Sequence, residues 1–168
     1  MSTADGTGRG QGGDRLVDRL LAAFETRHAT FTNKAMQFVA MPLLVWGGLA
    51  VLRALPVPDG MSAVPGLDWS IAAAMIGIIA ALALSLRLGA GMAVFFAVLL
   101  LLVFVYQWRE PLPLWQPGLV ALGAGWLAWL VGRRTEGRPR VLTEIAIDLL
   151  TGPLWLVASV LRLLRIGY

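Results

Sequence analysis

Four long runs of uncharged and mostly apolar residues constrain the fold of this chain more than any other feature. Each run is 18 to 22 residues long and lies between charged residues, and together they cover nearly half of the 168 residues. A helix that crosses a bilayer needs about 17–25 predominantly apolar residues. The sequence therefore predicts four transmembrane helices, at residues 35–52, 69–86, 88–108 and 111–132.

The composition agrees with a membrane protein and excludes several kinds of site. Hydrophobic residues make up 58% of the chain and charged residues 14%, whereas a soluble domain carries about 25% charged residues. The chain has no cysteine, which excludes disulfides and thiolate metal sites. Its one histidine, His28, excludes a site that takes two imidazoles from one chain.

The distribution of Lys and Arg predicts how the chain crosses the membrane. If the N-terminus is inside, ten of these residues up to position 140 lie on the inner side and two, Arg53 and Arg109, lie on the outer side. Cytoplasmic loops carry an excess of basic residues. We therefore expect a multi-pass protein of the inner (plasma) membrane whose N-terminus and 133–140 loop are cytoplasmic. The net charge of +4 fits membrane lipids rather than nucleic acid as the partner.

The segments around the spans predict the remaining domains. Residues 1–13 are small, polar and glycine-rich, which is typical of a disordered tail. In residues 14–34, apolar side chains repeat at helical spacing and charged ones occupy the other face, so we expect an amphipathic helix on the cytoplasmic surface. Residues 133–168 form a basic loop and a C-terminal segment. Its apolar run, 149–161, is short and interrupted by Gly152-Pro153, which predicts an interfacial or re-entrant helix pair, with a fifth span as the alternative.

The expected fold is thus an all-α polytopic bundle, with residues 35–132 as its four-helix transmembrane part. The spans hold no charged side chain, which argues against a transporter with a charged path. Ala73 and Gly77, and likewise Ala121 and Gly125, place small residues four positions apart, which lets helix backbones approach closely. This spacing favours packing within the bundle, and a homo-oligomer interface is the alternative.

Three stretches of the chain together resemble a known family. They are His28, Asn33, Gln37 and Pro42 before and in the first run, Gly125-Trp126-Leu127 through Gly132 to Glu136-Gly137, and Leu149-Leu150 followed by Gly152-Pro153-Leu154-Trp155. The pattern extends from about residue 24 to the C-terminus. It is similar to a family of small polytopic membrane proteins that includes the yeast-type 2-hydroxy fatty acid alpha-dioxygenases and bacterial relatives. The resemblance implies an iron-dependent oxygenase that shortens a 2-hydroxy acyl chain by one carbon.

The resemblance also implies which residues would form such a site. His28 matches the first ligand histidine of the family, Asn33 matches an asparagine, and Glu136 matches an acidic position. Gln37 and Arg133 stand where the family has its other histidines. An iron(II) oxygenase site is built from imidazoles and a carboxylate, and the permanent charge of an arginine repels a metal ion. We therefore expect no metal site and no cofactor, with Fe²⁺ as the alternative.

The sequence thus predicts a non-catalytic or divergent integral membrane protein, which binds lipid or serves as an accessory subunit of a membrane complex. Four basic residues would bind the phosphate or carboxylate of lipid headgroups, and they are Arg133, Arg134, Arg138 and Arg140. The alternative is a 2-hydroxy fatty acid dioxygenase with an altered metal site at His28, Asn33 and Glu136. We also expect His28, Asn33 and the 133–140 loop to lie together, and a pocket between His28, Arg133 and Arg134 to hold lipid or detergent.

Overall fold

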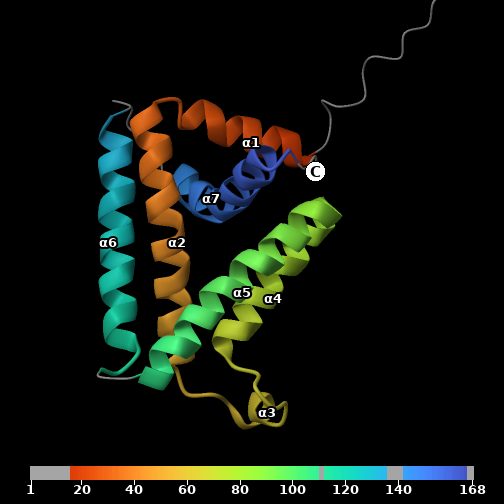
Figure 1. Ribbon diagram of the computed structural model, residues 1–168, viewed down its shortest axis with the longest axis vertical. Coiled ribbons are helices and arrows are strands. Elements are labelled where there is room, and N and C mark those ends of the chain that lie inside the picture. The colour runs from red at the N-terminus through yellow and green to blue at the C-terminus, as the bar shows by residue number, and fades with distance from the viewer. Residues whose placement is uncertain (1–15, 110–111, 136–141, 166–168) are drawn as a thin grey trace, which may run out of the picture.

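The computed structural model describes residues 16–109, 112–135 and 142–165, and nearly all of them are helical (Figure 1). The expected all-α fold is confirmed, since no strand occurs in this described part of the chain. The tail 1–13 lies outside the described residues. The helices are α1 (Leu16–Arg27), α2 (Phe31–Arg53), α3 (Asp59–Ser62), α4 (Trp69–Leu84), α5 (Leu86–Arg109), α6 (Trp115–Arg134) and α7 (Leu142–Leu163).

Two pairs of long helices form the body of the molecule (Figure 1). Helices α2 and α6 lie side by side, and α4 and α5 form a second pair that is inclined to the first. The pairs approach each other near the end that carries α3 and separate toward the opposite end, where α7 lies between them and contacts α2 and α5. Helix α1 runs across this wider end, roughly perpendicular to α2, and packs on α7.

Helices α2, α4, α5 and α6 occupy the four apolar runs, and two of them are long and apolar enough to cross a membrane. These two are α2, with 23 residues, and α5, with 24 residues. Helix α4 is apolar but shorter, with 16 residues. By length and composition alone, α2 and α5 suggest an association with a membrane.

Two boundaries differ from the sequence-based expectation, and local hydrogen bonding explains both. The helix expected over 14–34 ends at Arg27, and α2 begins at Phe31, because the Thr30 hydroxyl accepts a hydrogen bond from the Asn33 amide and so caps a new helix. The second and third predicted helices, 69–86 and 88–108, were separated by Arg87 alone, whereas the break lies at Ser85, whose extended backbone (φ −162°) separates α4 from α5. Arg87 is therefore inside the first turn of α5.

The C-terminal segment is one helix, and the expected pair of helices is wrong. Helix α7 continues through Pro153, which lies inside it. Gly152 and Pro153 are buried, and a Cβ added at Gly152 would collide with the Met41 side chain on α2. The packing of this stretch against α2 holds the helix together despite the backbone hydrogen bond that proline removes.

Small residues let the helices of each pair approach closely. A Cβ added at Gly125 of α6 would lie 2.8 Å from Leu44 Cγ of α2, and one added at Gly47 of α2 would lie 2.7 Å from the Gly118 carbonyl oxygen. In the second pair, a Cβ at Gly77 would lie 2.7 Å from the Phe96 ring. The expected packing within the bundle is thus confirmed for Gly77 and Gly125.

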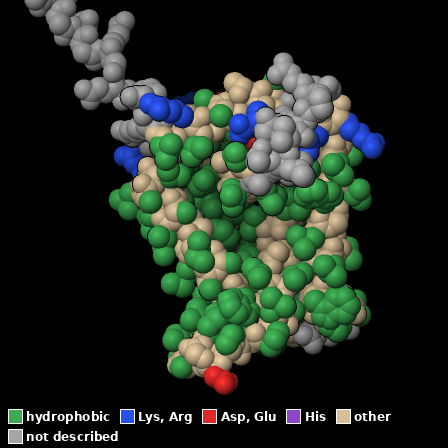
Figure 2. Space-filling view, turned by 180° about the vertical axis from the view of Figure 1, so that it is seen from behind, with side chains coloured by type: hydrophobic (Ala, Val, Ile, Leu, Met, Phe, Trp, Pro, Cys, Tyr) green, Lys and Arg blue, Asp and Glu red, His purple; other side chains and the backbone are tan. Residues whose placement is uncertain are grey.

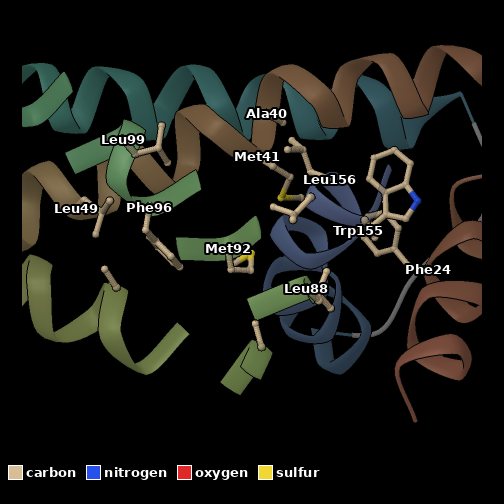
Figure 3. Packing of buried hydrophobic residues seen from close by; sticks show 14 of the residues in the cluster. Phe24, Ala40, Met41, Leu49, Leu88, Met92, Phe96, Leu99, Trp155 and Leu156 are labelled. Carbon is tan, nitrogen blue, oxygen red and sulfur yellow. The ribbon is translucent and has the colours of Figure 1, made fainter. Parts of the chain in front are cut away.

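The hydrophobic core runs through the molecule and includes side chains of α1, α2, α4, α5, α6 and α7 (Figure 3). Phe24 of α1 packs against Trp155 of α7, with ring centroids 5.2 Å apart. Met41 of α2 and Met92 of α5 are buried in the same cluster. Because α1 buries Phe24 completely, it is part of the packed molecule rather than a helix attached only by its chain.

Apolar side chains also cover most of the outer surface of the long helices. Figure 2 shows green side chains over the middle of the molecule and blue Lys and Arg side chains at one end. Among the exposed apolar residues are Ile76 of α4, Val94 of α5 and Val120 of α6, which are 69%, 66% and 72% exposed.

Candidate functional site

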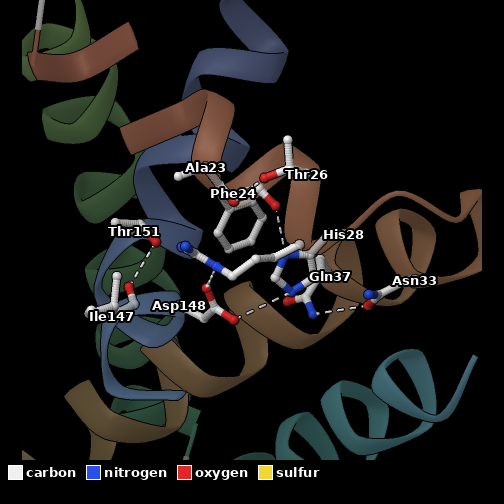
Figure 4. Close-up of polar contacts among 10 residues, drawn as sticks. Ala23, Phe24, Thr26, His28, Asn33, Gln37, Ile147, Asp148 and Thr151 are labelled. Carbon is white, nitrogen blue, oxygen red and sulfur yellow. Dashed lines mark hydrogen bonds and ion pairs between the residues drawn. The ribbon is translucent and has the colours of Figure 1, made fainter. Parts of the chain in front are cut away.

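His28 lies in a buried polar cluster between α1, α2 and α7 (Figure 4). Its ring stacks on Phe24, with centroids 4.0 Å apart and an angle of 16° between the planes. Nδ1 lies 3.0 Å from the Phe24 carbonyl oxygen, and only an N–H can form a hydrogen bond with that acceptor. Nδ1 therefore carries a proton, and Nε2 is left to face α7.

Asp148 of α7 is the partner that faces His28, and it is completely buried. Its Oδ1 accepts a hydrogen bond of 2.7 Å from Arg27 Nε, which is also an ion pair. Its Oδ2 lies 3.9 Å from His28 Nε2. A carboxylate buried this deeply is stable only when it is paired, so Arg27 keeps Asp148 in the interior and joins the end of α1 to α7.

Sequence analysis did not identify Asp148 or Arg27 as site residues. In the sequence, Asp148 stands directly before the apolar run 149–161, and a single acidic residue at such a boundary is typical of a solvated position. The sequence carries one signal that could have identified Asp148. It directly precedes a short apolar run, and a lone carboxylate next to apolar residues that become buried needs a basic partner.

Asn33 and Gln37 lie one helical turn apart on α2 and complete the cluster. Both are fully buried, and Gln37 Nε2 donates a hydrogen bond of 3.3 Å to Asn33 Oδ1. Gln37 Oε1 is buried and accepts no hydrogen bond from the described residues. A Cβ added at Gly132 of α6 would lie 2.6 Å from Asn33 Oδ1, so only glycine allows α6 to pass this close to the amide.

A chain of hydrogen bonds joins the start of α2 to the end of α6. Thr135 Oγ1 donates to the Gly132 carbonyl oxygen at 2.6 Å, so Thr30 is the donor in the 3.0 Å contact between the two threonine hydroxyls. The structure thus brings Thr30 and Asn33 beside the end of α6, which agrees with the expected clustering for Asn33. Glu136, Arg138 and Arg140 lie outside the described residues.

The basic residues at the end of α6 are more exposed than His28. Arg133 places its guanidinium over the Trp129 ring, 4.4 Å from the centroid, and Arg134 is exposed. His28 is fully enclosed. The expected pocket between His28, Arg133 and Arg134 stays a prediction.

The polar cluster offers two ionisable groups of the kind that iron binds, one imidazole and one carboxylate. A non-haem iron(II) site uses two histidines and a carboxylate, and the described residues contain no group of three His, Cys, Asp or Glu side chains that could hold a metal ion. Asp148 is also engaged by the guanidinium of Arg27. The described residues by themselves therefore do not fit an iron centre. The side chains of the polar cluster instead connect three helices.

A second polar cluster lies at the opposite end, where α2, α4 and α5 meet. Arg53 pairs with Asp68, donates to Gln107 Oε1 and lies 4.1 Å from the Phe104 ring centroid. Asp68 caps α4 by accepting hydrogen bonds from the amides of Ser70 and Ile71 at 2.8 and 3.1 Å. Burial raises the pKa of Asp68, but the hydrogen bonds and the charge of Arg53 outweigh it, so the pKa lies below its usual 3.8.

No protein-family model, no curated protein and no solved structure matches this chain. What the chain does is therefore inferred from its residues and their geometry alone.

Proposed function

We propose that this chain is an integral membrane protein that spans the bilayer four times and binds anionic lipid headgroups at its basic end. The observation that carries the proposal is the surface of the four long helices, which exposes apolar side chains between two ends that carry the charged residues. Soluble monomers rarely expose continuous apolar patches larger than a few hundred Å². In a bilayer, the same side chains would contact acyl chains.

Helix lengths support four spans rather than two. Helix α6 has 20 residues, which correspond to about 30 Å, the thickness of the hydrocarbon core. Helix α4, with 16 residues, is about 24 Å long and begins at Trp69, a residue type that is enriched at the membrane interface. It forms a close hairpin with α5, and α5 has the length and hydropathy of a span.

The distribution of basic residues supports headgroup binding at one end. The end with α1 and the α4–α5 turn carries most of the described Lys and Arg residues, which are Arg19, Arg27, Lys34, Arg87, Arg133, Arg134, Arg162 and Arg165. The α3 end carries Arg53 and Arg109. Anionic headgroups attract such clusters by about 1 kcal/mol per basic residue near the surface, and the exposed Arg134 next to the loop 135–140 is the group best suited to contact them.

Lipid retention by the purified protein tests this proposal. We expect native mass spectrometry of detergent-solubilised protein to detect retained phosphatidylglycerol in preference to phosphatidylcholine. Arg134→Gln should lower the retention about fivefold, which corresponds to about 1 kcal/mol. Arg165→Gln removes the same charge at the end of α7 and serves as the control. Equal losses in both variants would indicate a diffuse attraction and contradict a site at the end of α6.

The proposal includes the absence of catalytic iron, and a specific observation favours the alternative. The buried imidazole of His28 facing a buried carboxylate, 3.9 Å apart, is the arrangement from which an altered oxygenase site could be built. Elemental analysis of protein purified without chelators should find no stoichiometric iron, and a 2-hydroxy fatty acid should cause no oxygen uptake. Iron near one atom per chain, with oxygen uptake that is lost in His28→Ala, would overturn the proposal and support the dioxygenase.

A further inference from the structure

An apolar groove lies between α2 and α5 on the side of the molecule away from the basic end. It has a volume of about 520 Å³ and is lined by Pro42, Trp46, Leu99, Leu102 and Tyr106 among others, with Arg109 at one end. This volume is within the range of sites that hold small molecules, about 300–1,000 Å³. The lining contributes no acidic side chain, so the groove combines an apolar wall with a single positive charge.

The length of the groove matches one leaflet of a bilayer. Leu99 and Arg109 are ten residues apart on α5, which corresponds to about 15 Å along the helix. The hydrocarbon core is about 30 Å thick, so a groove that starts at headgroup level at Arg109 ends near the bilayer midplane at Leu99. An acyl chain of a lipid in that leaflet would run along the groove over its whole length.

One charged group at the end of the groove is placed for the polar part of such a lipid. Arg109 is the last residue of α5 and is exposed, so its guanidinium can pair with a phosphate oxygen. The walls of the groove are otherwise apolar, and the Trp46 indole ring meets Tyr106 edge-on at a centroid distance of 6.4 Å. Trp46 Nε1 is buried within the protein, so Trp46 presents its apolar ring carbons to the groove.

We infer that this groove binds one anionic phospholipid from the leaflet on the α3 side. Its acyl chain packs along Pro42, Leu99 and Leu102, and its phosphate pairs with Arg109. The inference rests on the proposed membrane insertion of the chain. It is independent of the proposed headgroup site at Arg134, which lies at the other end of the molecule.

Photo-crosslinking in vesicles tests the inference. The protein is reconstituted with phosphatidylglycerol that carries a diazirine on its acyl chain, and crosslinked peptides are identified by mass spectrometry. We expect labelling of the peptides that contain Trp46 and Leu102 to exceed labelling of the exposed face of α6 around Leu127 at least fivefold. Leu102→Trp, which fills the groove, should abolish this excess. The control Leu127→Trp places the same ring on a side chain that is 63% exposed and should leave the excess unchanged.

The headgroup preference provides a second measurement. Arg109→Gln should reduce the preference for labelling by phosphatidylglycerol over phosphatidylcholine at the groove and leave acyl-chain labelling in place. Even labelling of the groove and of α6, or an excess that survives Leu102→Trp, would overturn the inference while membrane insertion stands. Failure of the protein to insert into vesicles would instead overturn both the inference and the proposed function.

Discussion

Two buried carboxylates decide much of the local structure at the scale of single residues. Asp148 joins α7 to α1 through Arg27, and Asp68 joins the start of α4 to the end of α2 through Arg53. Each is an acceptor that is enclosed by the chain and paired with a guanidinium, because a buried carboxylate without a partner is strongly unfavourable. The two ends of the molecule therefore each depend on one ion pair between residues distant in sequence.

Removing the charge of Asp148 should destabilise the fold. In Asp148→Asn the guanidinium of Arg27, which is about one quarter exposed, loses its charged acceptor, and hydrogen bonds to charged groups contribute about 2 kcal/mol. We expect a lower thermal midpoint in detergent. The matched control is Glu25→Gln, which breaks the exposed pair between Glu25 and Arg162 that also joins α1 to α7; exposed pairs contribute about 0–1 kcal/mol. Equal effects of the two substitutions would contradict the role assigned to Asp148.

Acidification should release the contact made by Asp68. Because its pKa is lower in the folded chain than the usual 3.8, the carboxylate stabilises the folded state fully above that pH, and this stabilisation is lost as pH falls through the folded-state pKa. Thermal unfolding measured from pH 6 downward should therefore show a loss of stability below about 3.8 that is weaker in Asp68→Asn. An identical pH dependence in the two proteins would contradict the assignment.

Close approach of α2 and α6 is the main feature at the scale of elements. Gly47 and Gly118 face each other across the pair, Gly125 lies against Leu44, and Gly132 lies against Asn33. The two helices thus pack with little side-chain material between their backbones, which is typical of membrane helices. This packing also positions the end of α6 beside Asn33 and Gln37, so the polar cluster and the helix contact depend on each other.

Alanine substitutions in α6 should distinguish the effect of close helix packing on stability from the effect of helix propensity. A Cβ at Gly125 would lie 2.8 Å from Leu44 Cγ, whereas a Cβ at Gly123 would have nothing within 4 Å. Overpacking a tight contact costs about 1–3 kcal/mol, so Gly125→Ala should lower the unfolding temperature in detergent. Gly123→Ala on the same helix should leave it unchanged or raise it slightly, since alanine favours a helix over glycine. A loss of stability in both variants would show that glycine flexibility, rather than space, is required.

At the scale of the whole molecule, the charged residues and the apolar helix surfaces define two ends and a belt between them. The chain runs between the ends along α2, α4, α5 and α6 in alternating directions. Helix α1 crosses one end, and α7 fills the space between the two pairs at that same end. A bilayer around the belt would leave the two polar clusters near opposite surfaces.

Cysteine labelling tests this arrangement directly, because the chain has no native cysteine. Asp5→Cys and Arg138→Cys should react with a membrane-impermeant maleimide from the cytoplasmic side, and Gly60→Cys in α3 should react from the other side. Treating right-side-out and inverted vesicles separately shows from which side of the membrane each cysteine is labelled. Labelling of position 60 from the same side as position 138 would contradict the four-span topology.

The amino-acid sequence by itself determined where the long helices lie, because charged residues are excluded from apolar runs and so mark their boundaries. It also predicted that the stretch 28–33 and the end of α6 lie at the same end of the molecule, because four consecutive helices of alternating direction return the chain to the end where the first one began. Helix caps and the exact turns were harder to predict, because a single hydroxyl such as that of Thr30 decides them.

Only the tertiary structure decided which residues meet. Arg27 and Asp148 are 121 positions apart, and no pattern in either local stretch identifies the other as its partner. Burial of His28 likewise depends on α1 and α7 covering it together (Figure 4). The groove between α2 and α5 is also lined by two helices that are not neighbours in the sequence. Local sequence determines helices, whereas the angle between them depends on side chains from three or more segments at once.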